Sequence, residues 1–158
     1  MRLWLAPILF ALSCTCTSPR LPDGALAFDR AAQRALVFGG RSSSGYLTNE
    51  MWAWDGGSWS QVTPPNLPSE REGHSMAWDS ARQRLVLFGG FTLTSLQNDT
   101  WEWNGLTWAQ RLPPLPLPPP REDAMLAFDS ARGRLVLFGG QTMNRGPLSD
   151  TWEWDGTT

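Results

Sequence analysis

The chain of 158 residues contains no lysine and has only one histidine, one tyrosine and two cysteines. All 13 basic residues are therefore arginine, and they form no basic block of the kind that binds nucleic acid. His74 is the single histidine, so a Ser/His/Asp relay or a zinc site has only one possible member. Both cysteines lie before residue 17, which excludes a disulfide framework in the rest of the chain. We therefore expect no catalytic residues, no metal and no cofactor.

The first 20 residues differ in character from the rest. Arg2 precedes an apolar run from Leu3 to Leu12, and small residues then lead to Pro19-Arg20. This order is typical of a secretory signal peptide, and the run is shorter than the roughly 20 apolar residues of a membrane-spanning helix. We predict that residues 1–20 form a signal peptide and that the protein is exported.

The end of this segment carries both cysteines, Cys14 and Cys16. The sequence Ala11-Leu12-Ser13-Cys14 resembles the processing box of bacterial lipoproteins, although that family prefers Leu where this chain has Ala11. We favour a lipid anchor at Cys14, with an ordinary cleaved signal peptide as the alternative. The expected location is a bacterial-type cell envelope, or the medium, with membrane contact only through the anchor.

Three similar seven-residue segments occur at intervals of fifty residues, at Arg34–Gly40, Arg84–Gly90 and Arg134–Gly140. Self-similarity at this period indicates an architecture built from copies of one unit. Each segment is an apolar run bounded by turn signals, which predicts a strand buried on both faces. A pair of glycines ends each run, permitting backbone angles or close approaches that a side chain would forbid. These structural glycines are Gly39, Gly40, Gly89, Gly90, Gly139 and Gly140.

Three further extended runs surround this segment in each copy. A first run such as Ala25–Phe28 is followed by an Asp that opens a tight turn. A third run with alternating Trp, such as 101–103, is followed by Asp-Gly or Asn-Gly, a strong hairpin signal. A fourth run has Trp at its second position, as in 58–62 and 107–111. The Trp residues that we assign to blade packing are Trp54, Trp59, Trp103, Trp108 and Trp154.

These features resemble the kelch repeat of galactose oxidase-like β-propellers: Gly-Gly after the second strand, an aromatic residue before Asp or Asn, and a later Trp. The segment Arg71–Ser75 is similar to the opening of a kelch repeat, and the resemblance covers residues 21–158. It implies an all-β fold of four-stranded antiparallel blades at about 25–62, 74–111 and 124–158. The third blade lacks its last strand.

Propellers typically have 4–8 blades, and this sequence encodes fewer than three complete ones. An open stack leaves apolar faces and strand edges exposed. Further blades or self-association are therefore needed to close a ring. We consider a fragment of a longer protein, a truncated gene, and a protomer that completes a ring with other copies, and we favour the first two because the sequence stops inside a blade.

The loops that differ between copies are the expected ligand contacts, because variation on a repeated scaffold tends to map to one face. They connect the second and third strands of a blade, or one blade to the next. The candidate contacts are Arg41, Tyr46, Arg71, Arg121 and Arg145. Alternatively, Tyr46 caps a neighbouring blade, and the two arginines that open blades pair with Glu72 or Glu122. The proline-rich segment 112–120 is interpreted as a stiff connection rather than a polyproline ligand.

We therefore predict a non-catalytic, exported binding or scaffold module that recognises a protein or a glycan through its variable loops. One alternative is an enzyme that resembles the periplasmic kelch mutarotases acting on sialic acid, with Arg71 and Glu72 directed to the central channel. Another is a non-functional remnant of a longer propeller protein, which would not melt cooperatively.

Overall fold

The computed structural model describes residues 18–143 and 146–158. The candidate lipidation site Cys14 and the candidate contact Arg145 lie outside the described residues, as does most of the predicted signal peptide. Within the described part of the chain, no helix is long and apolar enough to cross a membrane.

Two four-stranded sheets follow one another along the chain, and every neighbouring pair of strands is antiparallel. Blade one contains β1 (Ala25–Asp29), β2 (Arg34–Phe38), β3 (Met51–Trp54) and β4 (Trp59–Val62). Blade two contains β5 (Ser75–Asp79), β6 (Arg84–Phe91), β7 (Leu96–Trp103) and β8 (Trp108–Arg111). In both blades the strands lie in sequence order across the sheet.

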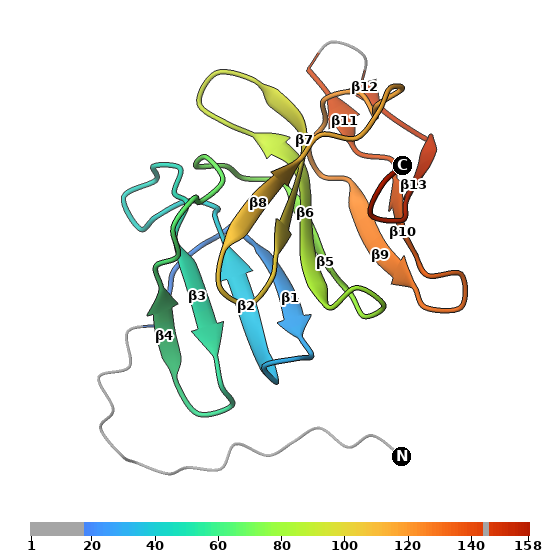
Figure 1. The fold of residues 1–158 in the computed structure, drawn as a ribbon. Coiled ribbons are helices and arrows are strands. Elements are labelled where there is room, and N and C mark those ends of the chain that lie inside the picture. The colour runs from blue at the N-terminus through green and yellow to red at the C-terminus, as the bar shows by residue number, and fades with distance from the viewer. Residues whose placement is uncertain (1–17, 144–145) are drawn as a thin grey trace, which may run out of the picture.

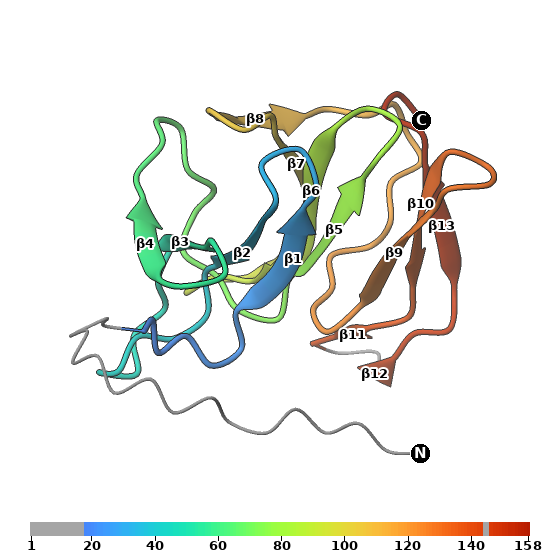
Figure 2. The ribbon, with the colours of Figure 1, turned by 90° about the horizontal axis from the view of Figure 1, so that it is seen from below.

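The third sheet has three strands, β9 (Met125–Asp129), β10 (Arg134–Phe138) and β13 (Thr151–Trp154), with β10 in the centre. A short hairpin of β11 (Gln141–Thr142) and β12 (Gly146–Pro147) lies between β10 and β13 in the sequence. The three sheets lie side by side as propeller blades (Figures 1 and 2). The prediction of an all-β fold, with two complete blades and a third of three strands, is confirmed.

The turns form as the sequence predicts. The Asp29 carboxylate at the end of β1 accepts hydrogen bonds from the backbone N–H groups of Ala31 and Ala32, both at 3.0 Å. In the β3–β4 turn, the carboxylate of Asp55 accepts from the N–H groups of Gly57 and Ser58. Such local bonds fold the chain back on itself within four residues, and each four-stranded sheet therefore contains two such hairpins, β1–β2 and β3–β4 in blade one and β5–β6 and β7–β8 in blade two.

The second strand is longer in blade two than in the other blades. In blades one and three the strand ends before the glycines, as predicted, but β6 continues through Gly89 and Gly90 to Phe91. The register shifts between Phe88 and Gly90, and both glycines have positive φ angles of 67° and 95°. A bulge at these glycines therefore lets β6 continue its pairing with β7.

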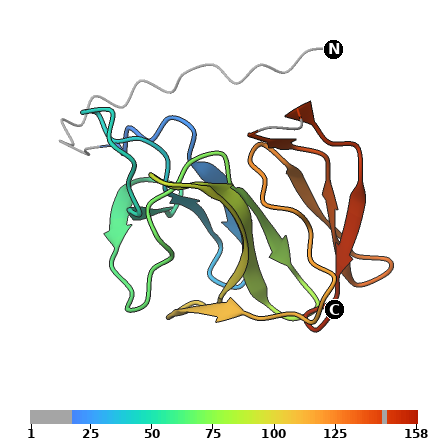
Figure 3. The same cartoon turned by 90° about the horizontal axis from the view of Figure 1, so that it is seen from above.

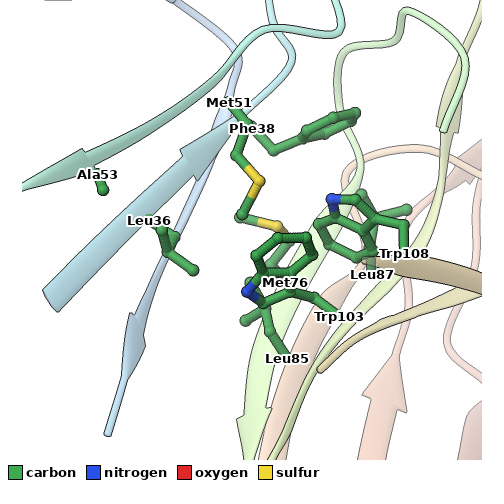
Figure 4. Packing of buried hydrophobic residues seen from close by; sticks show 9 residues of the cluster. All are labelled: Leu36, Phe38, Met51, Ala53, Met76, Leu85, Leu87, Trp103 and Trp108. Carbon is green, nitrogen blue, oxygen red and sulfur yellow. The ribbon is translucent and has the colours of Figure 1, made fainter. Parts of the chain in front are cut away.

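The main core lies between blades one and two (Figure 4). Trp103 and Trp108 from blade two are only 1% and 2% exposed. The ring centroids of Trp108 and Phe38, which lies on β2 of blade one, are 5.6 Å apart. The two blades are thus held together by side chains that cross from one sheet to the next. The buried cluster consists of Leu36, Phe38, Met51, Ala53, Met76, Leu85, Leu87, Trp103 and Trp108.

Candidate functional site

Arg71, which opens blade two, is 1% exposed. Its guanidinium forms a bidentate pair with Asp99, at 2.7 Å for Nη1–Oδ1 and 2.9 Å for Nη2–Oδ2. Nη1 also donates to the carbonyl of Gly89, and Nε and Nη2 donate to the backbone carbonyl and hydroxyl of Ser69. These bonds use all five N–H donors of the guanidinium. Arg71 therefore holds its own blade together and presents no donor to a ligand.

Arg121 repeats this arrangement at the start of blade three, with an exposure of 0%. It pairs with both carboxylate oxygens of Asp150, at 2.6 and 2.7 Å, and donates to the carbonyl of Gly139. Hydrogen bonding to this guanidinium, together with a bond from the indole of Trp152, lowers the pKa of Asp150 to about 2. Arg121, expected from the sequence to contact a ligand, is buried inside the blade.

The partners of these arginines differ from those that the sequence suggests. The alternative pairing with Glu72 or Glu122 is wrong, because the partners are Asp99 and Asp150, 28 and 29 positions further along the chain. A carboxylate next to an arginine in an extended chain points away from it, whereas the third strand brings its own acid into register beside the start of the blade. We call each group of arginine, aspartate and glycine carbonyl a blade clamp.

Each blade clamp is joined to the preceding blade through the paired glycines. The N–H of Gly40 donates to the carbonyl of Arg71 at 2.7 Å, and the N–H of Gly90 donates to the carbonyl of Arg121 at 2.9 Å. A Cβ at Gly89 would lie 2.7 Å from that same carbonyl of Arg121. The glycines are thus required for the close approach of consecutive blades.

His74 lies at the contact between blades one and two, only 6% exposed. Its ring meets that of Phe38 edge-on, with centroids 5.5 Å apart and planes at 81°. Burial lowers the pKa of His74 to about 3, and the neighbouring charge of Arg71 acts in the same direction. The imidazole is therefore neutral in the folded protein and has a packing role.

The burial of His74 predicts a loss of stability in acid. The pKa in the folded state lies below the unfolded value near 6.5, so the unfolded chain binds more protons between pH 6.5 and 3. The contribution of neutral His74 is complete above about pH 6.5 and falls by up to about 1.4 kcal/mol per pH unit below it. Urea unfolding at pH 7, 5.5 and 4.5 should show this slope, and His74→Gln should reduce it. Equal slopes in both proteins would contradict the assignment.

The connection between the second and third strands carries one exposed large hydrophobic side chain in each blade. Tyr46 lies between β2 and β3, Leu93 between β6 and β7, and Met143 between β10 and β13. Their exposed fractions are 74%, 68% and 67%. All three connections lie at the same end of the blades, at the top in Figure 1, and Figure 3 shows this end from above. We call Tyr46, Leu93 and Met143 the loop tips.

Acidic side chains lie beside these loops at the starts of blades two and three. Glu72 forms an ion pair with Arg41, which also donates to the carbonyl of Gly45 at 3.1 Å. Burial raises the pKa of Glu122, and the nearby negative charges of Asp123 and Glu72 raise it further. Of the predicted contacts, Arg41 and Tyr46 therefore share the loop face, and Arg41 is partly neutralised there.

A cavity of about 70 Å³ lies between blades two and three. Its lining includes Phe88 from blade two and Leu135 and Trp154 from blade three. The matching residues between blades one and two surround the indole of Trp108, which packs against Phe38 and Trp103. This cavity therefore corresponds to a packing position of the repeat and does not indicate a ligand site. Among residues 18–143 and 146–158, no group of three or more His, Cys, Asp or Glu side chains is placed to hold a metal ion.

Comparison with known proteins gives a structural likeness. No family model matches the chain, and no curated protein matches it. Among solved structures, 132 chains match. One of them, titled "Structure of YjhT", has a TM-score of 0.65 at 15% sequence identity over 83% of this chain. The present chain covers 42% of the length of that protein. At this identity the likeness shows the fold alone.

Several residues that are prominent in the structure have little signal in the sequence. Leu93 and Met143 carry no motif, and their only signal is an apolar residue within a divergent polar loop. Asp99 and Asp150 could have been found from their recurrence two residues before the third-strand Trp.

Proposed function

We propose that the chain is a kelch-type binding module that contacts a protein partner through the loop tips. The observation that carries this proposal is the repetition of an exposed apolar side chain at one end of all three blades. Exposed apolar and aromatic residues gathered on one face are typical of protein interfaces. The blade clamps support the proposal, because they hold the loops on a rigid frame and use internally the arginines that would otherwise be available for chemistry.

A protein partner fits this face better than a glycan. Sugars are commonly held by stacking on exposed aromatic rings, and Tyr46 is the only aromatic among the three tips. Leu93 and Met143 offer apolar area without a ring face, and Met adapts readily to irregular protein surfaces. The proposal includes export and a lipid anchor at Cys14, both supported by the character of residues 1–20.

Site-specific photo-crosslinking in the producing cell tests the binding proposal. A benzophenone amino acid placed at position 46, 93 or 143 should give the same discrete crosslinked species from all three positions. The matched control is Leu106, which is 79% exposed but lies in the β7–β8 turn at the opposite end of blade two. Crosslinking at position 106 as strong as at the tips, or none at the tips, would reject the proposal.

The carbohydrate-active alternative has less support. Arg71, its expected anchor for a carboxylate, has all its donors occupied inside blade two. Glu122 and Asp123 add negative charge to the adjoining surface, which disfavours an anionic sugar such as sialic acid. Acceleration of anomer exchange of sialic acid by the purified protein, measured by NMR, would restore this alternative.

A further inference from the structure

Each blade carries an acid two residues before the first Trp of its third strand: Glu50, Asp99 and Asp150. In each blade this acid accepts a hydrogen bond from the indole N–H of that Trp. The N–O distances are 2.8 Å for Trp52 and 2.7 Å for both Trp101 and Trp152. The carboxylate is thus held in a corresponding orientation in the three blades.

Blades two and three add an arginine to this acid, and blade one does not. Leu21 stands in blade one at the position of Arg71 and Arg121, fifty and one hundred residues earlier. Glu50 is correspondingly without an ion pair among residues 18–143 and 146–158. Its described side-chain hydrogen bond is the one from Trp52, to Oε2. Blade one therefore has the acid of a blade clamp without the guanidinium.

A cavity of about 430 Å³ lies at this place, lined by Ser18, Pro19, Arg20, Leu21, Ser42, Ser43, Glu50 and Trp52. Processing at Cys14, as in a lipoprotein, would leave residues 18–20 in the mature chain. In blade three the corresponding residues surround the guanidinium itself: Arg121 pairs with Asp150, and its Nε donates to the carbonyl of Pro119. The cavity in blade one is thus lined by Pro19, Glu50 and Trp52, the counterparts of the Pro119, Asp150 and Trp152 that surround the guanidinium of Arg121 in blade three.

We propose that this cavity binds the guanidinium group of a ligand that carries arginine, with Glu50 as the paired carboxylate. A carboxylate accepts two parallel N–H bonds from a planar guanidinium, and the compact ammonium of lysine does not reproduce this geometry. Glu50 is one methylene longer than Asp99, so it reaches further toward a group that enters from solvent. This assignment stands on the comparison between blades and does not require the loop-tip proposal.

The cavity adjoins the loop face. Ser42 lines it, and the N–H of Ser42 donates to the carbonyl of Tyr46 at 2.8 Å. A bound guanidinium therefore lies near the start of the loop that presents Tyr46. Failure of guanidinium binding would leave the crosslinking result unchanged, because the two experiments use different residues.

Titration of the full chain with N-acetyl-L-arginine amide, followed by tryptophan fluorescence and by NMR, tests the proposal. We expect saturable binding, with N-acetyl-L-lysine amide at least about tenfold weaker. Glu50→Gln should weaken the binding of the arginine amide by at least about tenfold. Because the Gln side chain still accepts the hydrogen bond from Trp52, the melting temperature should change little. Leu21→Arg should also abolish binding, because it supplies the repeat's own guanidinium to Glu50.

A second arm with a tripeptide that contains a central arginine identifies the source of the ligand. Tighter binding of the tripeptide than of the amide assigns the site to an arginine within a polypeptide, and equal binding assigns it to a free guanidinium compound. The absence of saturable binding, or binding retained in both Glu50→Gln and Leu21→Arg, would overturn the proposal. Binding that appears only after Arg20→Gln would also overturn it, since Arg20 lines the cavity and would then be its native occupant.

Discussion

Replacement of Arg71 by methionine should lower the free energy of unfolding by about 3–5 kcal/mol. The guanidinium is 1% exposed and pairs with both oxygens of Asp99, so its removal leaves a carboxylate with little access to water and no counter-charge. It also removes the donor from the carbonyl of Gly89. Breaking a buried pair from one side costs far more than the pair itself contributes. Urea unfolding of the two proteins at neutral pH measures the difference.

Two variants control this measurement. Arg30→Met removes a guanidinium from an exposed residue of the β1–β2 turn and should change stability by no more than about 0.5 kcal/mol. Replacing Asp99 by leucine in the Arg71→Met background should recover part of the loss, because no unpaired charge then remains inside the blade. A loss in Arg71→Met as small as that in Arg30→Met would show that the blade clamp is solvated.

The architecture is predictable from the sequence because its signals are periodic. Copies fifty residues apart, each with an apolar run, paired glycines and alternating Trp, leave few folds to consider. The turns are equally readable, since Asp29 and Asp55 form their bonds within three residues of themselves. Local chemistry thus accounts for the strands and hairpins.

Interactions between distant segments were less predictable. The sequence places Arg71 beside Glu72, and only the fold brings Asp99 close enough to pair with it. Whether an arginine meets a ligand or an internal carboxylate depends on this long-range register. The continuation of β6 through Gly89 has the same origin, because it depends on the pairing of Gly90 with Gln97 and of Phe91 with Leu96.

The candidate site likewise contains one residue that the sequence makes recognisable and others that only the structure reveals. Tyr46 is recognisable as the single tyrosine in a variable loop, and the structure leaves it exposed. Leu93 and Met143 become meaningful only when three loops are seen at one end of the blades (Figure 1). That Glu50 has no ion pair among residues 18–143 and 146–158 is informative only beside its counterparts Asp99 and Asp150, which pair with arginines. The blades are predictable from one sequence because their segments repeat. The binding surface is less predictable because it lies in loops that differ between the copies.

The comparison of Trp108→Ala with Trp59→Ala is the second prediction with a large effect. The two indoles form almost the same local pair: Trp108 lies 5.7 Å from Trp103 at 43°, and Trp59 lies 5.6 Å from Trp54 at 45°. The two indoles differ in their burial and in their contacts with the neighbouring blade. Trp108 is 2% exposed and packs against Phe38 of blade one, whereas Trp59 is half-buried.

Measurement of the free energies of unfolding of these two variants tests most directly whether the blades are packed against one another. Trp108→Ala should lose about 3–5 kcal/mol, as expected for truncation of a fully buried Trp. Trp59→Ala should lose less than half as much, because the half-buried indole of Trp59 buries less apolar area than that of Trp108. Equal losses in the two variants, or a loss of less than about 1 kcal/mol in Trp108→Ala, would contradict the account of consecutive blades sharing one core.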